Sequence, residues 1–221
     1  MRETYREQLD DVLDGLVKMS QAVAVAVRKS TTALLEADIH IAQEVIAADE
    51  ELDRAQAEQE HHLFSLLARQ APVAGELRIV VASMRMVSEL ERMGDLAAHV
   101  AKIARLRYPD RAVPEPLQAN FVRMAEVAEA MVTAAGATLT DRNVDSAQEL
   151  RAQDQEMDDL RRTQFRVLLG EDWTYGVEAA VDVALLGRYY ERIADHAASM
   201  ARRVIYIVTG KFPDSEVWPQ P

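Results

Sequence analysis

The chain has 221 residues, of which 49% are hydrophobic and 28% charged, the balance of a soluble globular protein. It contains no cysteine, which excludes disulfides, thiolate metal ligands and a cysteine nucleophile. The net charge of −12 disfavours binding to nucleic acid or directly to an anionic membrane, because both depend on Lys and Arg. We expect no secretory signal and no membrane span, and therefore a cytoplasmic protein.

Strong helix formers dominate the composition, whereas aromatic residues make up only 5% and turn residues are few, with 8 Gly and 7 Pro. The sequence therefore predicts an all-α fold of six long helices. Their expected ranges are 3–36, 38–70, 73–107, 115–141, 143–169 and 174–209. Three of the seven prolines lie in "YPDRAVPEP" (108–116), the best candidate for a linker. The end of the chain, 211–221, is expected to be a loosely ordered tail.

The chain contains an internal repeat. "AQEVIAADEELD" (42–53) matches "AQELRAQDQEMD" (147–158) at 7 of 12 positions, with an offset of 105. "ERMGDLAAHVA" (91–101) matches "ERIADHAASMA" (191–201) at 6 of 11, with an offset of 100. Short loops make neighbouring helices antiparallel. The sequence thus predicts two pseudo-symmetric three-helix up-down bundles, 1–108 and 117–210, joined by a linker at 109–116.

The third and sixth expected helices each carry two carboxylates four residues apart, within or beside a stripe of small and apolar residues. These are Glu91 with Asp95, and Glu191 with Asp195. Residues at i and i+4 share a helix face, so the two charges of a pair repel each other, and partial burial adds to the cost. A divalent cation would compensate, because hard cations favour several carboxylate oxygens. The rival interpretation is a solvated edge on which the carboxylates pair with arginines.

The second and fifth expected helices carry a parallel pattern. Asp49 and Asp53 match Asp154 and Asp158, again four apart. In a three-helix bundle these carboxylates could approach those of the third and sixth helices, although such residues are also common on helix surfaces. An E-x-x-H spacing at Glu58 and His61 occurs once and is not repeated, so we treat it as coincidence. No motif for catalysis is present, and we expect no enzymatic activity.

At "LERMGDLAAHVAKI" and "YYERIADHAASMARRV" the sequence resembles the PhoU family, and "APVAGELR" is most similar to its actinobacterial members. The resemblance covers essentially the whole chain. It implies metal ions, iron or zinc in the first place and otherwise magnesium, manganese or calcium, on the duplicated E-x-x-x-D motifs. It also implies weaker ligands at the four aspartates of the second and fifth helices.

The resemblance further implies a negative regulator of phosphate uptake and of the phosphate-starvation response. Its expected partners are the ATPase of a Pst-type phosphate ABC transporter and a sensor histidine kinase, with a second copy of the chain forming a homodimer. Contact with the membrane is expected only through these partners. Two alternatives stay open: a ferritin-like enzyme with a carboxylate-bound metal, and a purely structural helical scaffold.

Overall fold

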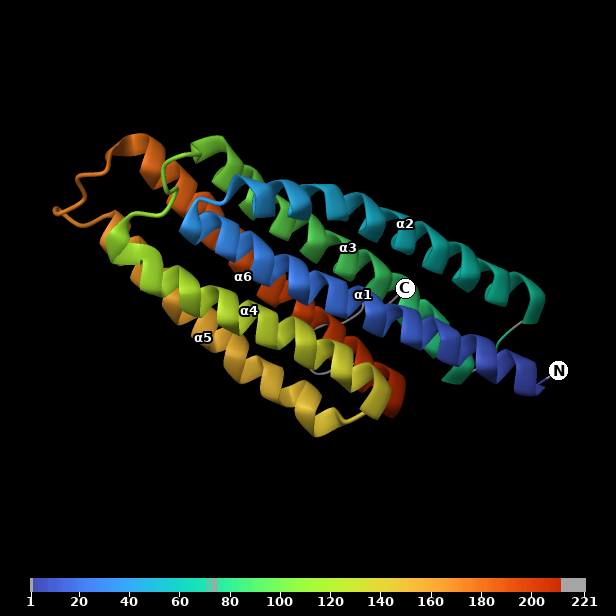
Figure 1. The fold of residues 1–221 in the computed structure, drawn as a ribbon. Helices are drawn as coiled ribbons and strands as arrows, with labels where there is room; N and C mark the ends of the chain where they lie inside the picture. The colour runs from blue at the N-terminus through green and yellow to red at the C-terminus, as the bar shows by residue number, and fades with distance from the viewer. Residues whose placement is uncertain (1, 71, 73–74, 212–221) are drawn as a thin grey trace, which may run out of the picture.

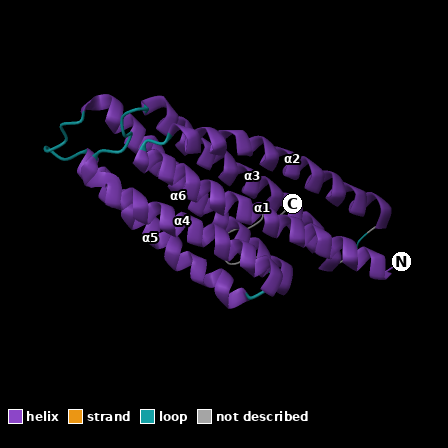
Figure 2. Cartoon of the chain, viewed as in Figure 1, coloured by secondary structure: helices purple, strands orange, loops and turns teal. Residues whose placement is uncertain are grey.

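The computed structural model describes residues 2–70, 72 and 75–211, and these form six long helices joined by short connections (Figures 1 and 2). The helices are α1 (Arg2–Glu36), α2 (Ile39–Gln70), α3 (Gly75–Arg107), α4 (Glu115–Asp141), α5 (Val144–Leu168) and α6 (Gly176–Thr209). The predicted all-α fold is confirmed. The predicted helix ends lie within a few residues of the observed ones, except that the start predicted at residue 73 lies outside the described residues. The tail expected at 211–221 lies, from residue 212 onward, outside the described residues.

The connection from α1 to α2 and that from α4 to α5 are built in the same way. Ala37 and Arg142, which differ by the repeat offset of 105, both adopt a left-handed backbone with φ of 55° and 48°. The next residue then caps the following helix. The Asp38 carboxylate accepts from the amides of residues 40 and 41, and the Asn143 side chain accepts from those of residues 145 and 146. The duplication seen in the sequence is therefore also a duplication of helix capping.

Each repeat folds as an antiparallel three-helix unit, and the two units pack tightly against each other (Figure 1). Helices α1, α3, α4 and α6 form the centre, with α1 against α4 and α3 against α6. Helix α2 covers α1 and α3 on one side, and α5 covers α4 and α6 on the other. Helix α4 begins at Glu115, as predicted, and Pro116 lies in its first turn, where proline is tolerated.

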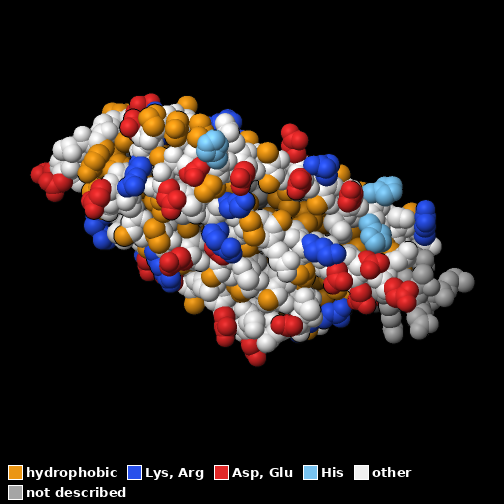
Figure 3. All heavy atoms as spheres, viewed as in Figure 1, with side chains coloured by type: hydrophobic (Ala, Val, Ile, Leu, Met, Phe, Trp, Pro, Cys, Tyr) orange, Lys and Arg blue, Asp and Glu red, His pale blue; other side chains and the backbone are white. Residues whose placement is uncertain are grey.

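A single hydrophobic core runs through both units and includes residues from all six helices. The small residues of the predicted stripes lie in the interior: Gly94, Ala98, Ala194 and Ala198 are all buried. Tyr190 of α6 is fully buried, and its hydroxyl lies 2.7 Å from Thr31 Oγ1 of α1, which ties the second unit to the first. On the face seen in Figure 3, acidic and basic side chains alternate rather than forming a field of one sign.

Candidate functional site

The four carboxylates predicted in the first repeat share one face, formed by α2 and α3. Glu91 and Asp49 are half-buried, whereas Asp95 and Asp53 are exposed. Burial raises the pKa of Glu91, and the negative charges of Asp95, Asp53 and Asp49 raise it further against the opposing effect of Arg92. Burial likewise raises the pKa of Asp49, with Asp95 and Asp53 adding to it. The structure therefore brings the four predicted residues within electrostatic range of one another.

The four carboxylates of the second repeat are also brought together, on the face formed by α5 and α6. Burial raises the pKa of Asp154, and so do the charges of Asp195, Asp158 and Glu191. Burial and the charge of Glu191 raise the pKa of Asp195. As in the first repeat, the glutamate and the first aspartate of α5 are half-buried and the other two are exposed.

The two faces differ in how the buried glutamate is compensated. Glu191 forms ion pairs with Arg161 Nε of α5 at 3.2 Å and with Arg188 Nη1 at 2.7 Å. The first of these arginines is itself 13% exposed, so the pair is largely removed from water. At the corresponding positions the first repeat has Gln56 and Ser88. Among the described residues none forms a hydrogen bond or ion pair with Glu91.

A small residue, Gly94, lies at the contact between α2 and α3 beside the first face. A Cβ placed on Gly94 would overlap the Leu52 side chain, which fills the space, and would lie 3.7 Å from Asp49 Oδ1. Gly94 therefore permits α2 to approach α3 closely at this point.

Nothing within 2–70, 72 and 75–211 forms a group of three or more His, Asp or Glu side chains already arranged to hold a metal ion. The donor chemistry of the first face nevertheless fits a hard divalent cation, since it offers several carboxylate oxygens whose mutual repulsion is offset only in part by Arg92 and Lys102. The second face fits such a cation less well, because its glutamate already has two guanidinium partners. A metal on the first face would be held by Glu91, Asp95, Asp49 and Asp53.

His99, one turn beyond Asp95, is exposed and held in a defined tautomer. Its Nδ1 lies 2.7 Å from the Asp95 carbonyl oxygen, and because a carbonyl can only accept, Nδ1 is the donor. Nε2 of the neutral ring is left as the atom that could bind a metal. The ring also packs against Tyr189 of α6, with centroids 5.5 Å apart. The corresponding residue, Ser199, instead donates to Glu89.

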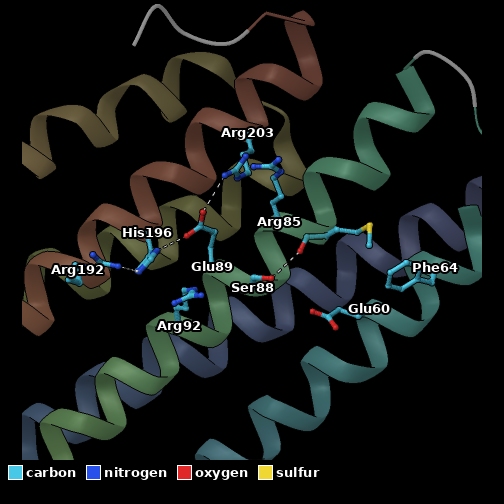
Figure 4. A pocket seen from close by; sticks show the side chains of 10 residues that line it. Glu60, Phe64, Arg85, Ser88, Glu89, Arg92, Arg192, His196 and Arg203 are labelled. Carbon is cyan, nitrogen blue, oxygen red and sulfur yellow. Dashed lines mark hydrogen bonds and ion pairs between the residues drawn. The ribbon is translucent and has the colours of Figure 1, made fainter. Parts of the chain in front are cut away.

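A cluster that sequence reasoning missed lies where α3 meets α6 (Figure 4). The Glu89 carboxylate accepts from His196 Nδ1 at 2.5 Å, from Ser199 Oγ at 2.9 Å and from Arg203 Nη2 at 3.4 Å. Burial alone would raise the pKa of Glu89, but these hydrogen bonds and charges outweigh it and lower the pKa to about 2. These residues are unlike their counterparts in the other repeat, so the repeat pattern gave no signal for them.

Comparison with known proteins agrees with this architecture. The family model described as "PhoU domain" matches residues 16–104 and 121–204, one range in each three-helix unit. The chain belongs to the PhoU family. It is 45% identical to "Phosphate-specific transport system accessory protein PhoU homolog 2" of Mycobacterium tuberculosis over 213 residues, which cover 96% of this chain and 100% of the relative. It is 43% identical to the PhoU homolog 1 of Mycobacterium leprae, with 99% of each chain covered.

Two solved structures have the same fold. The crystal structure of PhoU from Pseudomonas aeruginosa superposes with a TM-score of 0.88 at 27% identity, covering 94% of this chain and 100% of that one. The PhoU structure from Streptococcus pneumoniae, at 23% identity, gives a TM-score of 0.86 over 95% of this chain and 99% of that one. The similarity to the PhoU family expected from the motifs is thus confirmed. The names of these relatives describe an accessory or regulatory protein rather than an enzyme.

Proposed function

We propose that this chain is a regulatory accessory protein of a phosphate-specific transport system. The observation that carries the proposal is its similarity, over nearly its whole length, to mycobacterial proteins that bear that name. In the described ranges no helix is long and apolar enough to cross a bilayer. Action at a transporter would then require docking onto a membrane-embedded partner, and the long helical faces of both units offer surface for this.

In this proposal the protein acts in the cytoplasm as an adaptor. It docks on the ATPase of a Pst-type ABC transporter and on a sensor histidine kinase, and it keeps the starvation response off when phosphate is plentiful. The test uses the full chain as bait against membranes of phosphate-replete cells, in the presence and absence of a chelator. Recovery of the ATPase and the kinase is expected, and reproducible absence of both would overturn the adaptor role.

The proposal includes a divalent metal on the first carboxylate face, held by Glu91 with Asp95 and assisted by Asp49 and Asp53. The purified chain is dialysed separately against iron(II), zinc, magnesium, manganese and calcium, and bound metal is measured. Glu91→Gln is expected to lower the bound metal sharply, whereas Glu191→Gln, the matched variant in the arginine-paired face, is expected to lower it much less. Equal metal content in wild type and Glu91→Gln would refute the site.

Two further expectations are tested alongside. A homodimer is proposed and is checked by light scattering of the purified chain with and without metal. The scaffold alternative is favoured by one observation, the pairing of Glu191 with two arginines in the second unit. If chelation changes neither stability nor partner recovery, the scaffold interpretation replaces the metal-dependent one.

A further inference from the structure

The groove between α2, α3 and α6 is the feature that the proposed function leaves unexplained. It has a volume of about 650 Å³ and opens over the contact between the two repeats (Figure 4). Four arginines line it: Arg85 and Arg92 from α3, and Arg192 and Arg203 from α6. This concentration of positive charge contrasts with the net charge of the whole chain, which is −12.

The acidic residues of the groove do not cancel this charge. Besides the four arginines, the lining includes two carboxylates, Glu60 of α2 and Glu89 of α3. Glu89 accepts hydrogen bonds from His196, Ser199 and Arg203, so its negative charge is spread over donors within the protein. The surplus in the groove is therefore two positive charges with His196 neutral.

Two of the arginines retain donor capacity. The Arg203 side chain is 11% exposed, and its Nε is buried without a hydrogen-bond partner among the described residues. An unsatisfied buried donor costs free energy unless something occupies the site. Arg192 Nη2 reaches His196 Nε2 only at 3.5 Å, and because a guanidinium can only donate, His196 Nε2 is the acceptor. This contact orients Arg192 while using a single weak hydrogen bond.

The set of four arginines is not repeated among the described residues, although the chain is a duplication. Arg92 and Arg192 correspond to each other, so each repeat contributes one arginine from the same place in its sequence. The counterparts of Arg85 and Arg203 are Leu185 and Ile103, which carry no charge. The cationic groove is thus an addition to the repeat pattern rather than a consequence of it.

From this geometry we propose that the α2–α3–α6 groove binds a phosphate-class oxyanion, either orthophosphate or a short chain of linked phosphates. Planar guanidinium groups donate paired hydrogen bonds to the oxygens of such anions. The volume admits an ion larger than a single phosphate. That the groove binds an oxyanion rests on its arginines alone; the choice of phosphate among oxyanions rests on the proposed function.

Binding is tested by calorimetry on the purified full chain, with orthophosphate, tripolyphosphate and sulfate as separate ligands. A chelator is present throughout, so that phosphate held by a metal on the carboxylate faces is not counted. Arg192→Gln is expected to weaken phosphate or tripolyphosphate binding about tenfold or more, the loss of a charge-assisted contact. Arg123→Gln, which removes an exposed and ion-paired arginine of α4, is the matched control and is expected to leave binding unchanged.

Glu89→Gln is expected to change the affinity for the anion in the opposite direction. It removes the negative charge of the groove while keeping an acceptor for His196, so anion binding is expected to become several-fold tighter. Saturable binding that responds to Arg192 and Glu89 in opposite directions supports the proposal. The proposal is overturned if none of the three anions binds saturably. It is also overturned if Arg123→Gln weakens anion binding as Arg192→Gln does. Equal affinity for sulfate overturns the assignment to phosphate. None of these measurements involves the transporter or kinase, so failure here is separate from failure of the adaptor role.

Discussion

Replacing Glu89 by Gln tests whether an ion network joins the two repeats. The Glu89 side chain is 16% exposed and receives three hydrogen bonds from α6. Gln has nearly the same shape and keeps an acceptor oxygen, so the variant removes the charge with little change in packing. Glu44→Gln is the matched control, because Glu44 is 61% exposed and pairs with Lys29 on the surface, where ion pairs contribute little.

The expected loss follows from the pKa of Glu89, which falls from 4.5 to about 2 in the folded chain. A depressed carboxyl pKa stabilises the folded state above the unfolded pKa, and this contribution is lost as the pH falls through the folded value. The difference between the folded and unfolded pKa values corresponds to a stabilisation of the folded state by about 3 kcal/mol at pH 7 and by about 2 kcal/mol near pH 3.5. The hydrogen bonds that Gln retains make both figures upper limits.

Urea unfolding of wild type and variants, followed by circular dichroism at the two pH values, measures these differences. Glu89→Gln should be less stable than wild type at pH 7, and the gap should narrow at the lower pH. Glu44→Gln should stay within about 0.5 kcal/mol of wild type at both. The argument would be refuted if Glu89→Gln changed the free energy of unfolding no more than the control does. It would also be refuted if the difference between Glu89→Gln and wild type did not change with pH.

Three further outcomes are expected, each measured by urea unfolding in a chelator. Glu91→Gln should stabilise the chain by about 0.5 kcal/mol at pH 7 because it relieves repulsion, and this gain should fade as the pH falls through the raised pKa of Glu91. Glu191→Gln should instead destabilise the chain by about 2 kcal/mol, because the buried guanidinium of Arg161 loses its partner. Changes of equal sign in the two variants would contradict this. Gly136→Ala should destabilise the chain by about 2 kcal/mol, since a Cβ there would overlap Ser20 Oγ and lie 2.9 Å from Ser20 Cβ. An unchanged urea midpoint would show that α1 and α4 can separate freely. Asn143→Ala should cost about 1 kcal/mol through loss of the α5 cap, and no loss would mean that the capping bonds contribute nothing net.

The sequence predicted the helices well because their ends depend on local chemistry. Asp38 and Asn143 cap helices with their own side chains, so a helix boundary can be located from a few neighbouring residues. It also predicted that Glu91 and Glu191 lie beside a buried stripe, since that placement follows from helical periodicity. It did not predict that Glu191 pairs with an arginine of the neighbouring helix, Arg161, whereas among the described residues Glu91 does not. That contact depends on how α5 is rotated against α6.

The cationic groove was beyond local reasoning for a related physical reason. Its walls come from α2, α3 and α6, and the residues of α3 and α6 that meet there are about 100 positions apart in the chain. A repeat comparison finds what two copies share, and two of the four arginines that line the groove, Arg85 and Arg203, have no charged counterpart. Arg203 stands where the first repeat has Ile103, and such a difference looks like ordinary divergence until the two helices are placed side by side.

The contact between α3 and α6 shows how one duplicated interface became two different ones. Glu89 meets Ser199, and the equivalent positions in the opposite repeats, Tyr189 and His99, also meet. The first contact is a carboxylate with hydrogen-bond donors; the second is a pair of aromatic rings. An ionic contact brings its compensating cations with it, here Arg203, and an aromatic one does not need them. Because Glu89 and Arg203 offset each other, the surplus of positive charge in the groove comes from the other three arginines, of which Arg85 has the uncharged Leu185 as its counterpart.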